Sequence, residues 1–223
     1  MSELNNNKNS ASFGFKKVTE TEKVSLVNNV FTSVTKNYDL MNDLMSFGLH
    51  RSWKSYFLLC SQIKKGDKVL DLAAGTGDIT RLISKTVGDS GQVVSCDINY
   101  SMLSQGRDNL IDKGVLDNVL YVQSDAQSLS FEENSFNHVT MAFGLRNTAN
   151  ISKALKSIYR ALKPGGSLQV LEFSKAEKII EKPYSLFLNN FIPFLGKHVA
   201  RDEDSYKYLA ESIKMHPSQI ELM

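Results

Sequence analysis

The chain has few of the residues that mark secreted, metal-binding or membrane-spanning proteins. Its 223 residues include only two cysteines, Cys60 and Cys96, which form no CxxC pair and have no nearby histidine at metal-ligand spacing. We expect both to be free, buried thiols in a reducing compartment, and we expect no metal site. No apolar run approaches the roughly 20 residues that cross a bilayer. The first residues are polar and rich in Asn and Ser, and they lack the apolar stretch of a secretory signal.

The chain also lacks a strong charge of either sign. Lys and Arg total 26 and Asp and Glu total 24, so the formal net charge is +2. No block of basic residues resembles the stripe of a nucleic-acid binder, which disfavours a polyanionic partner. Hydrophobic residues make up 42% of the chain, an ordinary globular share. We therefore expect a cytoplasmic protein with no nucleic-acid partner.

Short apolar runs alternate with helical patterns through the middle of the chain. This alternation predicts βαβ units, and hence an α/β fold with a doubly wound, mostly parallel sheet and helices on both faces. The runs cover residues 68–72, 93–96, 119–122, 136–142 and 167–173.

Other segments predict the parts around this sheet. Apolar residues at helical spacing predict a helix over 20–36, and a second is expected over 201–215. Lys163-Pro164-Gly165-Gly166 indicates a helix stop and a turn. Residues 183–199 are apolar but interrupted by Pro193 and Gly196, which predicts a mobile cover rather than a regular element.

The length of the chain favours one domain. We expect a disordered tail over residues 1–12 and a single domain over 13–223. Within that domain, 13–62 would form an N-terminal helical cover and 63–223 a Rossmann-like core.

The turn Gly75-Thr76-Gly77 directly follows the first predicted strand and opens a helix. A doubly wound sheet places its ligand at this point, and the helix N-terminus offers free N–H groups. A dinucleotide site would need a third glycine at position 80, where this chain has Thr80. Asp78 would also repel a pyrophosphate. The turn therefore disfavours a nicotinamide dinucleotide.

Carboxylates lie at the ends of the first three predicted strands. Asp71 and Asp78 would attract the ammonium and sulfonium charges of S-adenosylmethionine (SAM). Asp97 is placed to accept hydrogen bonds from ribose hydroxyls, and Asp125 to reach an adenine amino group. The alternative is that Asp71, Asp78 and Asp97 only cap helices and turns. Their joint placement on successive strand ends favours a SAM site.

Three stretches carry a family resemblance: Tyr38–Trp53, Phe143–Asn147, and Arg160–Gly166 continuing to Leu171–Ser174. Together they resemble the quinone C-methyltransferases of menaquinone and ubiquinone synthesis, the UbiE/COQ5 family. The resemblance implies a class I SAM-dependent methyltransferase that methylates a ring carbon of a polyprenylated quinol, such as demethylmenaquinol or 2-polyprenyl-6-methoxy-1,4-benzoquinol. It also implies a homodimer or a quinone-synthesis complex, and peripheral contact with the inner face of the membrane.

The resemblance also implies which residues contact the cofactor, and it implies that this chain is shorter at its C-terminal end than class I methyltransferases usually are. The family's contacts fall on Thr76, Asp97, Asp125, Ala126 and Ala142, in addition to the turn glycines. Class I methyltransferases end with an antiparallel strand pair after the last helix. We expect that pair to be missing here, which would make the strand over 167–173 an exposed edge, and we interpret the chain as truncated.

Four residues are candidates for the chemistry. Arg146 and Asn147 follow the fourth strand, at the edge where the sulfonium would lie. Arg146 can stabilise a phenolate or position a water that removes the proton. His50 and Tyr38, in the N-terminal cover, are candidates for a general base or an orienting group. The alternatives are a structural histidine and an ion-paired arginine.

Two other functions remain open at this stage. One is an N- or O-methyltransferase acting on another small molecule, and the other is a SAM-binding scaffold without catalysis. Residues 186–199 would take the isoprenoid tail or touch the membrane surface, or else simply pack over the sheet.

Overall fold

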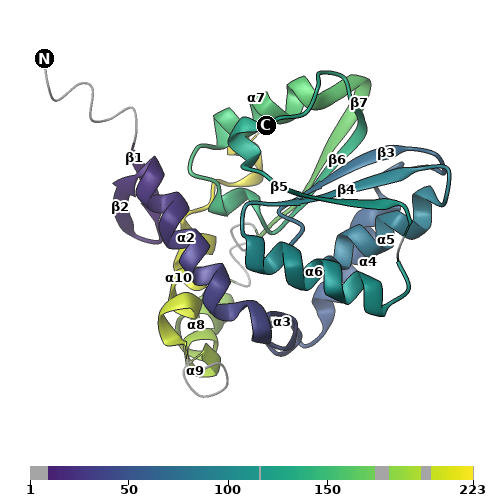
Figure 1. The fold of residues 1–223 in the computed structure, drawn as a ribbon. Helices are drawn as coiled ribbons and strands as arrows, with labels where there is room; N and C mark the ends of the chain where they lie inside the picture. The colour runs from purple at the N-terminus through teal and green to yellow at the C-terminus, as the bar shows by residue number, and fades with distance from the viewer. Residues whose placement is uncertain (1–9, 116, 174–180, 197–201, 223) are drawn as a thin grey trace, which may run out of the picture. The chain divides into compact units, whose positions relative to one another are not determined.

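The computed structural model of the chain describes residues 10–115, 117–173, 181–196 and 202–222 (Figure 1). They form two compact units, one within 1–45 and 173–223 and the other within 46–172. This grouping differs from the expected division at residue 62. Residues 46–62 belong with the sheet, because one helix of this segment packs on it, and the chain from residue 173 belongs with the N-terminal helices.

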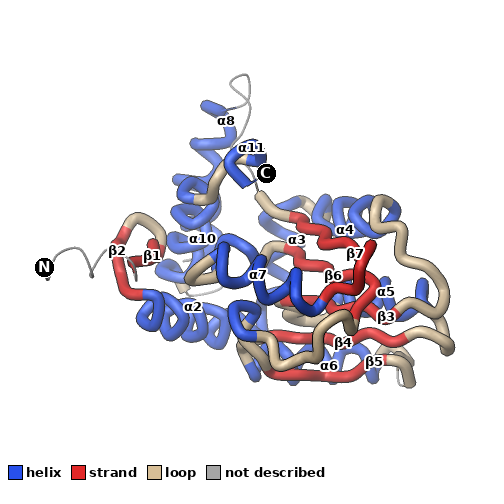
Figure 2. The backbone as a smooth tube through the Cα atoms, turned by 90° about the horizontal axis from the view of Figure 1, so that it is seen from above, coloured by secondary structure: helices blue, strands red, loops and turns tan. Residues whose placement is uncertain are grey.

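The unit over 46–172 contains the predicted parallel sheet. Its five strands lie in the order β5-β4-β3-β6-β7 (Figure 2), and every neighbouring pair is parallel. The order runs outward from β3 to β5 and then returns to place β6 beside β3. All carboxyl ends therefore meet at one edge, where such sheets bind ligands. The strands are β3 (Lys68–Leu72), β4 (Gln92–Asp97), β5 (Val119–Gln123), β6 (Phe136–Ala142) and β7 (Leu162–Leu171).

Helices cover both faces of this sheet, as predicted. In Figure 1, α5 and α6 lie on one face and α7 lies on the other. The helices are α4 (Leu49–Leu59), α5 (Asp78–Val87), α6 (Tyr100–Asp112) and α7 (Ile151–Ala161), with short 3₁₀ turns η3 (Ala126–Ser128) and η4 (Leu145–Asn147).

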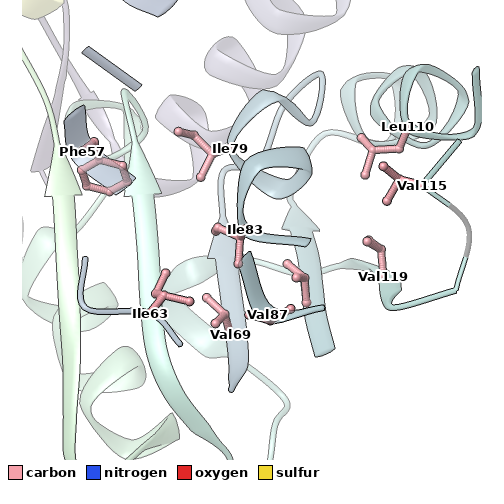
Figure 3. Close-up of a cluster of buried hydrophobic side chains, with 10 residues drawn as sticks. Phe57, Ile63, Val69, Ile79, Ile83, Val87, Leu110, Val115 and Val119 are labelled. Carbon is pink, nitrogen blue, oxygen red and sulfur yellow. The ribbon is translucent and has the colours of Figure 1, made fainter. Parts of the chain in front are cut away.

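A hydrophobic cluster joins the sheet to the helices of the α5 face (Figure 3). Ile79, Ile83 and Val87 recur every four residues, so one side of α5 is apolar and buried. Ile83 has no exposed surface, and truncating such a side chain to alanine typically costs about 2–5 kcal/mol. The cluster is completed by Phe57, Ile63, Val69, Val93, Leu110, Val115 and Val119.

The expected turn over Lys163–Gly166 is only partly correct. Helix α7 ends at Ala161, but β7 already begins at Leu162. Phe136 pairs with Leu162 whereas His138 pairs with Ser167, so the extra residues form an irregularity within the pairing of β6 and β7. Among the residues that the structure describes, β7 is an edge strand and no strand follows it.

The second unit begins with a hairpin that corrects the expected tail (Figure 2). Strand β1 (Ser10–Phe13) pairs with β2 (Lys16–Thr19), so Ser10–Ser12 are not a disordered tail; residues 1–9 lie outside the described part. Gly14 adopts φ +57°, which suits this tight turn, and Ala11 is buried. The hairpin leads into α2 (Glu20–Val34), η2 (Thr35–Asn37) and α3 (Tyr38–Ser46).

The segment expected to be an irregular cover is helical up to Leu195. It forms α8 (Glu181–Leu186), a π-helical stretch (Phe187–Phe191) and α9 (Ile192–Leu195). Pro193 lies inside this continuous helical run, two residues after the π-helical stretch ends at Phe191. A proline in a helix interior removes one backbone hydrogen bond. Ile192 and Leu195 are buried in an apolar cluster, which stabilises the helix. Residues 197–199 lie outside the described part.

Helix α10 (Glu203–Met215) confirms the last predicted helix, and α11 (Gln219–Leu222) follows it. A small hydrogen-bonded group joins α10 to α2. The hydroxyls of Ser33 and Ser205 donate to the same oxygen of Asp202, over 2.6 and 2.8 Å. The unit is thus held together by residues from the two ends of the described chain.

Candidate active site

The turn between β3 and α5 has the backbone that the sequence indicated. Ala73, Gly75 and Gly77 adopt φ angles of 52°, 55° and 86°, and α5 begins directly after Gly77. Helix α6 packs closely against this turn, since a Cβ added at Gly106 would lie 2.6 Å from the Gly75 carbonyl oxygen. Thr76 is almost fully buried, and its carbonyl accepts a hydrogen bond from Asn109 of α6. The turn is therefore rigidly seated.

Asp97 ties this turn to the end of β4. Its carboxylate accepts the amide hydrogens of Gly75 and Asn99, over 2.9 and 2.8 Å. Burial raises the pKa of Asp97, and the amide donors partly oppose that shift. Each carboxylate oxygen has a further lone pair, so the side chain can also accept hydroxyl donors. This geometry fits the predicted role of Asp97 toward ribose.

Asp71 lies within the core, between β3, β6 and α5. Its two oxygens accept hydrogen bonds from the hydroxyls of Thr140 (2.8 Å) and Thr80 (2.6 Å). Burial raises the pKa of Asp71 to about 6, although both hydroxyls oppose the shift. Asp71 thus links β3 to β6 and to the first turn of α5, and its carboxylate has no exposed surface.

The ends of β5 and β6 bring the remaining predicted cofactor residues to the same edge. Asp125 caps η3 by accepting the amide hydrogen of Gln127 at 2.9 Å, and the Gln127 side chain also donates to both carboxylate oxygens. Ala126 is the first residue of η3, and Ala142 is the last residue of β6. Asp125 therefore has a capping role that the sequence did not indicate, beside its proposed role in binding.

Arg146 and Asn147 lie in η4, directly beyond β6. Arg146 Nη1 lies 2.6 Å from Glu172 Oε1 and 2.7 Å from the Phe143 carbonyl oxygen. The Asn147 amide donates to the same carbonyl at 3.3 Å. The Arg146 and Glu172 side chains are only 6% and 5% exposed. The ion pair considered from the sequence is present, and it fixes a guanidinium at the carboxyl edge of the sheet.

His50 and Lys54 occupy successive turns on the buried side of α4. Lys54 Nζ lies 2.8 Å from Asp78 Oδ2, at the start of α5. Burial alone would raise the pKa of Asp78, but the Lys54 ammonium, helped by Lys113 and His50, holds it below its usual value. Tyr38 belongs to the other unit, where its ring centroid lies 6.3 Å from that of Phe31.

Two residues of this edge, Glu172 and Lys54, received no role from the sequence. Glu172 stands in one of the motif stretches, and Lys54 follows His50 by four residues, which places both on one side of a helix. That spacing was the available signal. Their ionic partners are 26 and 24 residues away in the sequence, so pattern alone did not reveal them.

The two cysteines differ in exposure, and neither a metal-ligand cluster nor a membrane-spanning helix is found in the described residues. Cys96 is buried, as expected, but Cys60 is exposed, because it caps the C-terminal end of α4 at the surface. Within the described residues, no three His, Cys, Asp or Glu side chains gather as metal ligands. In that same part of the chain, no helix has the length and hydropathy to cross a membrane.

The parallel sheet, the glycine turn and the Asp97 carboxylate at the end of β4 are those of a class I SAM-dependent methyltransferase, with SAM as co-substrate. The fold is similar to a solved SAM-dependent methyltransferase from Aquifex aeolicus, with 26% identity and a TM-score of 0.52 over 56% of this chain and 66% of that one.

The chain belongs to the ubiE/COQ5 methyltransferase family, whose model matches residues 16–223. Two similar relatives are each named ubiquinone/menaquinone biosynthesis C-methyltransferase. The relative from Idiomarina loihiensis is 52% identical over 96% of this chain and 85% of its own length. The one from Pseudoalteromonas translucida is 55% identical over 93% of this chain and 83% of its own length.

Proposed function

We propose that this chain transfers the methyl group of SAM to a ring carbon of a polyprenylated quinol, in menaquinone or ubiquinone biosynthesis or in both. The observation that carries the proposal is family membership over nearly the whole chain, together with relatives named for this reaction. The site supports it, because a cofactor turn and a buried, fixed guanidinium occupy the same edge of one sheet.

Cofactor binding is assigned to the turn and the strand ends. Gly75, Thr76 and Gly77 would let the backbone approach the cofactor closely. Asp97 would accept the ribose hydroxyls. The adenine would lie near Asp125 and Ala126, beyond β5. Ala142 would contact the cofactor from the end of β6, and Asp71 would act from the core through its hydrogen bond to Thr80 of α5.

The chemistry requires an electron-rich ring carbon in line with the methyl group, which SAM supplies as an electrophile. Charge is neutralised as that carbon attacks the sulfonium methyl, so positioning in a dry pocket supplies much of the acceleration. Arg146, oriented by Glu172, would stabilise the phenolate form of the quinol or hold a water that takes the proton of the quinol hydroxyl. A guanidinium stays charged at neutral pH and is a poor base itself. Asn147, His50 and Tyr38 are proposed to orient the ring or receive the proton.

Contact with a membrane surface is part of the same proposal, since a polyprenylated quinol is a lipid. Helix α4 exposes Leu49, Trp53 and Tyr56, at spacings of four and three residues. In the other unit, Leu186 and Phe194 are also exposed. Exposed aromatic and aliphatic side chains of this kind suit the interface between headgroups and acyl chains. A homodimer, or a place in a quinone-synthesis complex, is proposed as well, and sedimentation would test it.

The test is methyl transfer from labelled SAM to a short-chain demethylmenaquinol, with the product analysed for the position of the new methyl group. Methylation at a ring carbon supports the proposal. Methylation at oxygen, or transfer only to an amine or another small molecule, would instead favour the other class of methyltransferase. Tight binding of S-adenosylhomocysteine without any turnover would indicate the scaffold.

A further inference from the structure

Lys54 and Asp78 form an ion pair beside the cofactor turn. The sequence indicated only that Asp78 would attract the positive charges of SAM, and Lys54 has no role in the assignments above. Lys54 lies on α4 and is only 8% exposed. Its ammonium is 2.8 Å from Asp78 Oδ2, and Asp78 is the first residue of α5, directly after Gly77. The pair therefore stands at the end of the turn that approaches the cofactor.

The positive charge of Lys54 affects more than one carboxylate near the cofactor turn. Besides Asp78, its positive charge acts on the buried carboxylate of Asp71. His50, one turn earlier on α4, and Lys113, at the end of α6, also act on Asp78. An ammonium is thus held inside the sheet unit near two carboxylates, both next to the turn in sequence.

Stability alone is a weak reason for such a pair. Burying a lysine carries a desolvation cost that one ion pair often fails to offset, and apolar replacements of buried pairs are frequently neutral. The pair of Arg107 and Asp108, by contrast, is about half exposed and carries little desolvation cost. The Lys54 side chain is 10% exposed and that of Asp78 is 26% exposed, so the carboxylate of this pair is partly open to solvent. Adjacent opposite charges are complementary to a zwitterion, because each charge can also bind the opposite charge of the ligand.

We propose that Lys54 and Asp78 together bind the amino-acid end of SAM, with Lys54 donating to its α-carboxylate and Asp78 accepting from its α-ammonium. The proposal rests on the SAM-dependent function. It adds α4 to the cofactor site and gives the segment before the sheet a direct part in binding.

Binding rather than turnover tests this proposal. S-adenosylhomocysteine and 5′-methylthioadenosine share the adenosine and the sulfur, but only the first carries an amino acid. Calorimetric titration of both ligands into the purified chain and into Lys54→Met is expected to show about a 10- to 100-fold loss of affinity for S-adenosylhomocysteine, the effect of one charge-assisted hydrogen bond. Affinity for 5′-methylthioadenosine should change by less than about threefold.

Lys54→Arg, which keeps the charge, is expected to restore most of the affinity for S-adenosylhomocysteine. Arg107→Met, which removes an exposed ion pair, is the matched control and should leave both affinities unchanged. Equal losses for the two ligands, or no loss for either, would overturn the proposal.

If Lys54→Met melts at a much lower temperature than the unmodified chain, Asp78→Asn provides the same comparison. This variant is expected to lower the affinity for S-adenosylhomocysteine but not for 5′-methylthioadenosine. An equal loss of affinity for both ligands again overturns the proposal. An unmodified chain that binds S-adenosylhomocysteine without methylating any quinol would contradict the proposed substrate and leave the amino-acid site standing. The two failures are therefore distinguishable.

Discussion

Arg146 and Glu172 join the ends of β6 and β7 through a buried ion pair, with Nη1 and Oε1 2.6 Å apart. The Arg146 backbone amide also donates to the second carboxylate oxygen at 3.2 Å. Glu172 thus holds both the side chain and the backbone of Arg146. A residue proposed to act on the quinol is held by the strand that forms one edge of the described sheet.

Removing one partner of this pair should be strongly destabilising. Arg146→Met or Glu172→Gln leaves a buried group without its counterpart, and a loss of about 3–5 kcal/mol in the free energy of unfolding is expected. Urea denaturation would measure it. The double variant Arg146→Met with Glu172→Leu should recover part of the loss. Arg107→Met, in an exposed pair, should change stability by no more than about 1 kcal/mol.

Asp71 should make stability depend on pH. Burial raises its pKa to about 6 in the folded state, so the folded chain keeps a proton that the unfolded chain releases at lower pH. Stability should therefore fall as the pH rises from about 4 to about 6, by up to roughly 3 kcal/mol, and then level off. Asp71→Asn should remove this slope. Parallel stability curves for the two proteins across that window would refute the assignment.

Gly106→Ala should disturb the cofactor turn. Alanine normally favours a helix over glycine by about 1 kcal/mol. Here the new Cβ would lie 2.6 Å from the Gly75 carbonyl oxygen, so the turn or α6 must move. We expect a net destabilisation of about 1–3 kcal/mol and weaker binding of S-adenosylhomocysteine. Asp108→Ala, an exposed substitution on the same helix, is the control. Stabilisation by Gly106→Ala would show that the turn yields easily.

Asp97→Asn should weaken cofactor binding through the same turn. An asparagine has one acceptor oxygen, so it cannot accept from both Gly75 and Asn99 in the present geometry. Affinity for S-adenosylhomocysteine should fall about tenfold or more, as measured by calorimetry. Asp67→Asn, just before the start of β3 and so at the opposite edge of the sheet, should leave that affinity unchanged. An equal loss in the two variants would assign the effect to general stability.

The parallel sheet and the cofactor turn were predictable because their signals are local. Alternating apolar runs and helical patterns determine a parallel sheet, and the position of Gly75 and Gly77 after the first strand determines where the ligand edge lies. The hairpin over residues 10–19 was missed because a two-stranded hairpin depends on what it packs against. The helical run over 181–195 differs from the expected irregular cover. Pro193 predicts a break, but the burial of Ile192 and Leu195 in the apolar cluster stabilises the helix across that position.

The ion pairs of the site were not predictable in the same way. Each ion pair joins two different elements: Lys54 of α4 pairs with Asp78 of α5, and Arg146 after β6 pairs with Glu172 after β7. Which residues meet therefore depends on how these elements pack. The four-residue spacing of His50 and Lys54 indicates that they share one side of α4, but it does not indicate which residues that side contacts. Asp97 shows the converse, since the turn-capping role that its residue type suggests is present in the structure, where it accepts the Asn99 amide hydrogen.

The hydroxyls of Ser33 and Ser205 meet on Asp202 although the two serines are 172 residues apart in the sequence. During synthesis, helix α2 leaves the ribosome long before α10 exists. At about 5–20 residues per second, it waits on the order of ten to thirty seconds for its partner. All of the parallel sheet is translated during that wait. Translation order therefore favours folding of the parallel sheet first, and the unit built from both ends of the described chain cannot close until α10 has been made.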